Sequence, residues 1–208
     1  GNVVNPNDIV DEYGADTMRT YIMFIGDFEK AAAWSANAVK GCKRFLDRVW
    51  NLGEMEHTGE DYSPANEAAV HKAIKKVSED IEAMKFNTAI AAIMELVNAL
   101  YLAKDELATT EEGRKVLSSA MATVLTLLAP ITPHVCEELW EDLGHARSID
   151  QEPWPVWKED ALQRDVLTVV IQINGKLRGK IEVPASASKE EVEQLALTEQ
   201  NIVRHLEG

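Results

Sequence analysis

Apolar residues recur at alternating intervals of three and four along the middle of this chain, the spacing that places them on one face of an α-helix. Four such runs follow one another from about Ser35 onward. They are Val39, Cys42, Leu46 and Val49; then Val70, Ile74, Val77, Ile81 and Met84; then Phe86, Ile90, Ile93, Val97 and Leu100; and finally Leu117, Ala120, Val124 and Leu127. Residues that break or cap helices separate the runs, so the connections between them are short. Helices of similar length with short connections favour an antiparallel, up-and-down bundle.

The stretch LLAPITPHVCEELWEDLG, residues 127–144, joins the fourth helix to a fifth. Pro130 cannot donate a backbone hydrogen bond and disfavours helix at the residue before it, so the fourth helix is predicted to stop there. Thr132 is a favourable N-cap, and Pro133 suits the first helical position, where the missing N–H costs nothing. Gly144 is suited to end the new helix. The sequence therefore predicts a tight corner between two packed helices.

Residues 1–30 are expected to form a stem segment that precedes the bundle. Asn7 or Asp8 is a candidate cap for a short helix that ends at Gly14, and Asp16 is a candidate cap for the next one. The second helix, TMRTYIMFIG, is apolar on nearly all sides, which predicts burial against other structure. Because the chain starts abruptly at Gly1, we interpret it as a piece of a longer protein.

The hydrophobic period changes after the bundle, which we assign to residues 31–150. Residues 151–165 carry two prolines and two tryptophans, and are predicted to form an extended linker packed onto the helices. In residues 166–208, two β-rich runs flank Asn174-Gly175, the preferred pair for a two-residue hairpin turn. A short helix is predicted at 189–197. The expected fold is mainly α: an antiparallel helical bundle followed by a small, truncated α+β domain with a β-hairpin.

Composition restricts the function of the chain more than it restricts the fold. The 208 residues carry a formal net charge of −14, which argues against broad, non-specific binding of nucleic acid, although a local basic patch remains possible. No uninterrupted apolar run has the length of about 18 residues that a membrane span needs. The N-terminus lacks the basic and apolar regions of a signal peptide. Cys42 and Cys136 fall on predicted apolar faces, as core thiols in a reducing cytoplasm would.

No catalytic motif, phosphate-binding loop or metal-ligand spacing occurs in the sequence. Two basic clusters are candidates for contacts with phosphate. The first lies on the predicted first bundle helix, and the second alternates along the second hairpin strand, where every second residue shares one side. The candidates are Lys40, Lys43, Arg44 and Arg48, with Trp50 nearby, and Lys176, Arg178 and Lys180. A solvated helix face and an ordinary wet strand face are equally good interpretations of the residues alone.

Four motifs resemble class Ia aminoacyl-tRNA synthetases. The opening GNVVNPNDIVDEYGADTMRTYIMF is similar to the segment that follows the KMSKS signature in leucyl, valyl and isoleucyl enzymes. RFLDRVWNL, residues 44–52, and the L-x-P-x-x-P-H-x-x-E-x-L-W pattern of the corner resemble the anticodon-binding helical bundle of that group. VVIQINGKLRGKIEVP, residues 169–184, resembles the start of the C-terminal domain of bacterial-type leucyl-tRNA synthetases.

The resemblance implies that the intact protein attaches leucine to tRNA(Leu) with ATP as a substrate. It also implies that this part positions the tRNA without being catalytic alone. The implied partner is tRNA(Leu), with no membrane, no cofactor in this part, a cytoplasmic location and a monomeric state. Two alternatives stay open: an acidic helical bundle that binds a protein partner, and the equivalent region of a valyl- or isoleucyl-tRNA synthetase.

Overall fold

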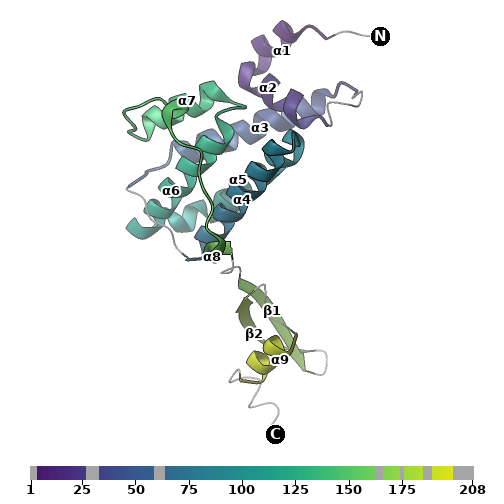
Figure 1. The fold of residues 1–208 in the computed structure, drawn as a ribbon, viewed down its shortest axis with the longest axis vertical. Coiled ribbons are helices and arrows are strands. Elements are labelled where there is room, and N and C mark those ends of the chain that lie inside the picture. Colours follow the sequence, from purple (N-terminus) through teal and green to yellow (C-terminus); the bar gives the residue numbers. More distant parts are fainter. Residues whose placement is uncertain are drawn as a thin grey trace.

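The protein is described here by a computed structural model that covers residues 4–26, 33–58, 64–162, 166–173, 176–184 and 189–198. The elements of these residues, shown in Figure 1, come in the order α1 (Pro6–Tyr13), α2 (Ala15–Phe24), α3 (Ala36–Gly53), α4 (Pro64–Glu82), α5 (Phe86–Leu107), α6 (Glu111–Leu128), α7 (Pro133–Asp142), η1 (Ile149–Gln151), α8 (Glu159–Leu162), β1 (Val166–Ile173), β2 (Lys176–Pro184) and α9 (Lys189–Thr198).

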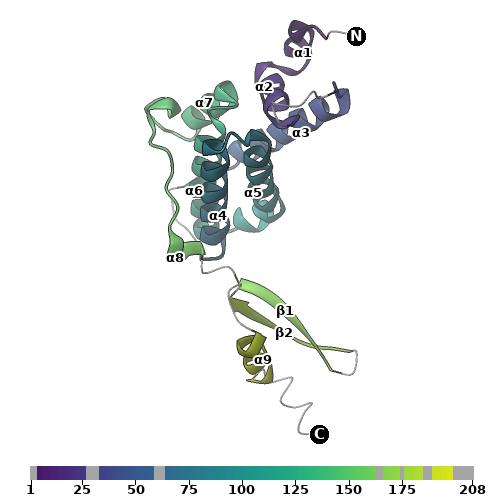
Figure 2. The same ribbon diagram turned by 45° about the vertical axis from the view of Figure 1, so that its right-hand side comes forward.

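The four predicted helical runs form one core. Helices α3 to α6 each turn their apolar face inward, and α7 closes the bundle at the end of α6 (Figures 1 and 2). The side chains with no exposed surface include Val49, Val77, Ile90, Ile93, Val97, Leu117, Val124 and Leu127. This part of the predicted fold, a mainly helical bundle, is confirmed.

Met84 departs from the predicted pattern. It was expected to continue the apolar seam of α4, but the helix ends at Glu82 and 65% of Met84 is exposed. Its φ of 58° lies in the left-handed region, which reverses the chain before α5 begins at Phe86. Met84 keeps the helical spacing of the apolar residues of α4, but it lies beyond the end of that helix. Spacing alone therefore placed it wrongly on the buried face.

The caps of the two N-terminal helices also differ from the prediction. Asn5 caps α1, and its side chain accepts a hydrogen bond from the Asn7 amide, so neither Asn7 nor Asp8 is the cap. Gly14, with a φ of 88°, precedes α2. Asp16 lies inside the first turn of α2 and reaches another helix, where it has a different role described below.

Helix α5 is long and apolar enough, by length and composition alone, to cross a membrane, and it is the one helix of this kind among the described residues. Its Ile90, Ile93 and Val97 are fully buried in the core shared with the neighbouring helices. Core helices of this kind pass the same test of length and composition, so this finding carries no membrane assignment.

An extended strap follows α7 and runs along the outside of the bundle to α8 (Figures 1 and 2). Trp154 donates from Nε1 to the Ser78 hydroxyl of α4 at 2.8 Å. The backbone amide of Lys158 donates to Nδ1 of His71, also on α4, at 3.2 Å. Because both anchors lie on α4, the strap holds that helix from the solvent side.

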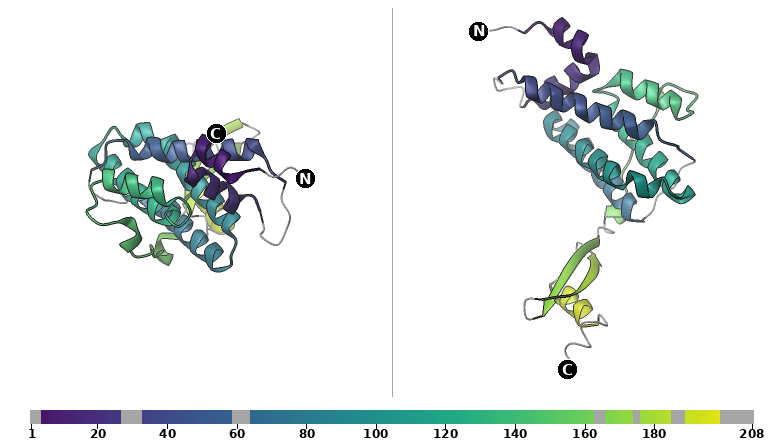
Figure 3. Two further views of the ribbon diagram at one scale, coloured as in Figure 1. Left: turned by 90° about the horizontal axis from the view of Figure 1, so that it is seen from above. Right: turned by 180° about the vertical axis from the view of Figure 1, so that it is seen from behind.

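Beyond α8, the structure has a two-stranded antiparallel sheet of β1 and β2, with α9 packed against β2. Figures 1 and 3 show these elements at the end of the molecule opposite α1 and α2. Asn174-Gly175, on which the predicted turn type depended, lies outside the described residues. So does the chain after α9.

Candidate nucleic-acid interface

The cationic cluster predicted on α3 divides into two groups in the structure. Lys40, Arg44 and Arg48 are exposed and follow one another at intervals of four, so they form a ridge along one side of the helix. Lys43 lies on the neighbouring side and forms an ion pair with Asp47, one turn later. No ion pair of Lys40, Arg44 or Arg48 occurs within the part of the chain that the structure describes, whereas the charge of Lys43 is locally neutralised.

Helix α5 extends this ridge with residues that are not among the candidates predicted from the sequence. Arg48 donates from Nη1 to the Asn98 side-chain oxygen at 2.5 Å. Its guanidinium carbon lies 5.8 Å from the ring centre of Tyr101, and the Lys104 ammonium lies 5.4 Å from the same centre. Both distances are within cation–π range. We call the combined surface of Lys40, Arg44, Arg48, Asn98, Tyr101 and Lys104 the α3–α5 surface.

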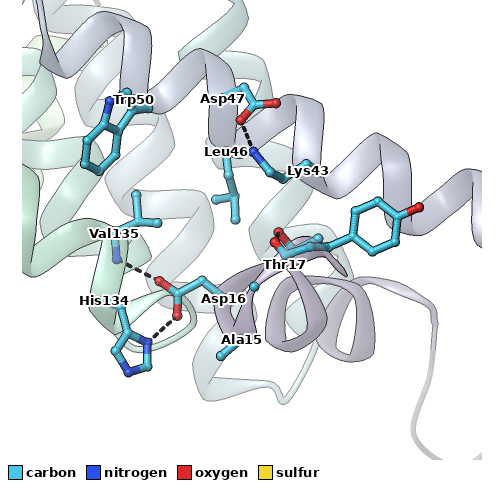
Figure 4. A pocket seen from close by; sticks show the side chains of 11 residues that line it. Ala15, Asp16, Thr17, Lys43, Leu46, Asp47, Trp50, His134 and Val135 are labelled. Carbon is cyan, nitrogen blue, oxygen red and sulfur yellow. Dashed lines mark hydrogen bonds and ion pairs between the residues drawn. The ribbon is translucent and has the colours of Figure 1, made fainter. Parts of the chain in front are cut away.

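Trp50, the last candidate on α3, lies on a different side. It lines a pocket of about 480 Å³ between α2, α3 and α7, together with Lys43 and His134 (Figure 4). The structure therefore does not bring Trp50 together with the ridge.

Asp16 links α2 to the start of α7 at this pocket (Figure 4). Only 5% of Asp16 is exposed, and its Oδ2 accepts a hydrogen bond from the Val135 amide at 2.7 Å. Its Oδ1 lies 2.8 Å from Nδ1 of His134. Thr132 is the N-cap residue of α7, as predicted, but its side chain makes no capping bond. Asp16 supplies the missing cap from another helix, because a carboxylate is a favoured acceptor at a helix N-terminus.

Arg19, one turn after Asp16, binds the other side of the same corner. Its Nε donates to the carbonyl of Ile131 at 2.7 Å and its Nη2 to the carbonyl of Pro130 at 2.9 Å. The Asp16 carboxylate accepts from a free backbone amide, and the Arg19 guanidinium donates to two free carbonyls. Together these contacts fix α2 to the α6–α7 corner. We call this pair of side chains and its four contacts the corner clamp.

The exposed His134 ring is held by the clamp. Its side chain is 75% exposed, although its Nδ1 contacts the buried carboxylate. This role of Asp16 and Arg19 was not predicted from the sequence. The sequence did offer one signal for it: two opposite charges lie about one helical turn apart on an otherwise apolar helix. Buried charges need partners, so these two side chains were candidates for contacts with another helix.

The predicted alternation along β2 is not maintained in the backbone pairing. Val170 pairs with Lys180 and Ile171 with Gly179, but Gln172 then pairs with Leu177, and Ile173 with Lys176. This register shift places one extra residue on β2 between Lys176 and Lys180, as a β-bulge does. The expectation of a single uninterrupted alternation through Lys176, Arg178 and Lys180 is therefore wrong at the level of the strand.

The two cysteines are free and buried, as expected for core thiols. Burial raises the pKa of Cys42 to about 11 and that of Cys136 to about 12, so both are thiols at neutral pH. No group of three or more metal-binding side chains occurs among the residues that the structure describes.

Comparison with known proteins decides the family. A family model described as the anticodon-binding domain of tRNA ligase matches residues 67–194. The chain belongs to this family. Its match covers nearly all of α4, continues through α7, the strap and the β1–β2 sheet, and extends into α9.

This anticodon-binding-type chain is similar over its whole length to curated leucine–tRNA ligases. It is 53% identical to that of Nitratidesulfovibrio vulgaris strain DP4 and 43% identical to that of Pseudomonas fluorescens strain Pf0-1. It spans about a quarter of their length, 27% and 25% respectively.

A solved structure shows the same arrangement. The crystal structure of the ternary complex of Agrobacterium radiobacter K84 agnB2 LeuRS, tRNA and LeuAMS matches with a TM-score of 0.71 and 29% identity. The match covers 100% of this chain and 28% of the LeuRS chain.

Proposed function

We propose that this chain is the tRNA-positioning part of a leucine–tRNA ligase, the enzyme that attaches leucine to tRNA(Leu) with ATP. The observation that carries the proposal is its similarity to leucine–tRNA ligases over the whole chain, at up to 53% identity. The same similarity favours a leucyl enzyme over a valyl or isoleucyl one and over a separate protein-interaction module.

The role in holding tRNA is supported by the charge distribution. In a chain with a net charge of −14, three exposed cations in line on one helix form a local exception to the overall repulsion of phosphate. The sequence contains no catalytic motif, so the chemistry with leucine and ATP belongs to the remainder of the ligase. The expected location is the cytoplasm and the expected state is a monomer, with no cofactor bound by this part.

The second part of the proposal is a separate tRNA contact made by the hairpin region. We assign residues 166–208 to the start of a small C-terminal α+β domain that contacts tRNA through Lys176, Arg178 and Lys180. A separate contact far along the chain from the bundle suits a ligase that holds tRNA by its backbone and shape. Because β2 contains a register shift, each of the three cations has to be tested singly.

The experiment compares the intact ligase with this chain. The affinity of the intact ligase for tRNA(Leu) is measured against salt concentration, and leucine-dependent pyrophosphate exchange is measured for both proteins. We expect affinity that falls steeply with salt, and exchange by the intact ligase alone. Exchange by this chain alone, or tRNA affinity that is independent of salt, would overturn the proposal.

A further inference from the structure

We infer that an apolar groove under the strap is a docking site for a segment of the ligase that lies outside this chain. The groove has a volume of about 410 Å³ and lies where the end of α2, the end of α4, the start of α5, the α6–α7 corner and the strap meet. Its apolar walls come from Met23, Ile81, Phe86, Ile131, Trp154 and Val156. We call it the strap groove. The inference rests on the proposed function, because it takes the chain to be part of a leucine–tRNA ligase.

The first step concerns apolar surface that the described residues leave uncovered. Val156, in the wall of the groove, is 78% exposed, and Trp154 is 37% exposed. Ile22 at the end of α2 is 42% exposed, and Met84 in the turn between α4 and α5 is 65% exposed. Both come within two positions of residues that line the groove. Single exposed apolar residues are normal, but several of them around one apolar groove mark a site of interaction.

The second step concerns the kind of occupant. The polar side chains in the lining are Ser78 and Glu82, and the Ser78 hydroxyl already donates to the Ile74 carbonyl and accepts from Trp154. A small-molecule site needs several convergent polar groups to orient its ligand, and this groove offers one carboxylate. No Lys or Arg of the described residues lines it, and Glu82 would repel phosphate, so RNA is disfavoured as well. The lining therefore suits an apolar segment of protein.

The third step concerns the rigidity of the walls. Trp154 is held by its hydrogen bond of 2.8 Å to Ser78 of α4. On the opposite wall, the carbonyl of Ile131 accepts from Arg19 of the corner clamp at 2.7 Å. A groove whose walls are fixed before binding loses little conformational freedom when a segment docks into it. It can therefore hold large apolar side chains of that segment in one arrangement.

The fourth step concerns the source of the segment. The chain spans 27% of the length of the Nitratidesulfovibrio vulgaris ligase, so nearly three quarters of such a protein lies outside it. The stem resembles the segment that follows the KMSKS signature, which implies that the rest of the ligase is attached there. Helix α2 of the stem contacts α5, and Figures 1 and 2 show it next to the end of the bundle where α4 passes into α5.

A segment attached beside the groove has an advantage over a separate protein. Covalent linkage gives it a high effective concentration at the site, which an independent partner or a second copy of the chain lacks. Its docking would also cover Ile22, in agreement with the apolar pattern of α2, which predicts burial on nearly all sides. The described residues alone leave that prediction unfulfilled on this side of α2.

The experiment places single cysteines in the intact ligase and measures their alkylation without tRNA, peptide by peptide, with mass spectrometry. Val156→Cys probes the groove, and Leu102→Cys is the matched control, because Leu102 is 89% exposed on α5. Each native rate is divided by the rate in denaturant. We expect Val156→Cys to react at least about tenfold more slowly than Leu102→Cys, since its reaction has to wait for the docked segment to open.

Two further measurements identify the occupant and its energetic effect. The photo-crosslinker p-benzoyl-phenylalanine in place of Val156 should cross-link within one ligase molecule to a segment outside this chain. Val156→Asp should lower the thermal midpoint of the intact ligase, because docking would then bury a charge without a partner. Leu102→Asp introduces the same charge at an exposed site and should leave the midpoint nearly unchanged.

Each outcome supports or overturns the inference. Equal native rates for the two cysteines would show an open groove and overturn it. So would a cross-link confined to this chain, a cross-link to a second ligase molecule, or protection that appears only when tRNA is added. Failure of the intact protein to bind tRNA(Leu) or to exchange pyrophosphate would instead overturn the proposed function, while the labelling and the cross-link would still report what covers the groove.

Discussion

Replacing Asp16 by Ala tests the corner clamp most directly. The change removes the carboxylate that accepts from the Val135 amide at 2.7 Å and contacts His134 at 2.8 Å. A hydrogen bond to a charged group is worth about 1.5–3 kcal/mol. The contact with His134 contributes less than about 1 kcal/mol, because that side chain is 75% exposed and its charge interactions are screened. The expected loss in the free energy of unfolding is therefore about 1.5–4 kcal/mol.

Asp16→Asn separates the charge from the cap. An asparagine oxygen can still accept from the Val135 amide, but the negative charge at the N-terminus of α7 is removed, at a cost of about 0.3–2 kcal/mol. Urea denaturation followed by tryptophan fluorescence measures both variants, with Trp50 at the same pocket as a reporter. Asp47→Ala is the control, because this exposed acid of α3 should contribute less than about 1 kcal/mol.

The clamp would be refuted by a loss of less than about 1 kcal/mol in Asp16→Ala with an unchanged denaturant slope. An equal loss in Asp16→Asn would instead show that charge alone matters and that the cap is unimportant. A reduced slope would mean that the variant exposes less surface on unfolding or no longer unfolds in a single step, and the two free energies would then not be directly comparable.

The remaining predictions concern the core. Leu127→Ala should lower the free energy of unfolding by about 2–5 kcal/mol in the same assay, since Leu127 has no exposed surface, and a loss below about 1 kcal/mol would contradict its packing. Gly53→Ala should cost about 1–3 kcal/mol, because the added methyl would lie 2.6 Å from a Leu139 methyl, and thermal melting would show whether α7 can shift to accept it. The thiols of Cys42 and Cys136 should resist alkylation at pH values near 8 in the native protein and react in denaturant, because burial raises their pKa to about 11 and about 12; fast native labelling would contradict the buried placement.

The bundle could be predicted from the sequence because each helix carries its own signal. The spacing of apolar residues fixes which side of a helix is buried, and the caps and prolines fix where it stops. The start of α7 at Pro133 followed from these local rules. The exception, Met84, lies where the helix has already ended, so helical spacing no longer described its environment.

The cluster on α3 was only partly predictable. Spacing along one helix groups Lys40, Arg44 and Arg48, but it cannot show that Lys43 is paired with Asp47 or that Trp50 lines a pocket near α7. These outcomes depend on which neighbour each side of α3 meets. The resemblance to the synthetases identified the family, but it did not distinguish the cations within this cluster.

Partners from distant parts of the chain were decided by the tertiary structure alone. Asp16 and Val135 are 119 positions apart, and Arg48 and Asn98 are 50 apart. Periodicity specifies which face of a helix is apolar, but not which helix lies against the polar edges of that face. The sequence by itself therefore determined the helices, their buried sides and the family. The packing of α2 on α7 and of α3 beside α5 decided that Asp16 caps another helix and that Arg48 lies over Tyr101, because these contacts exist only once the helices are assembled.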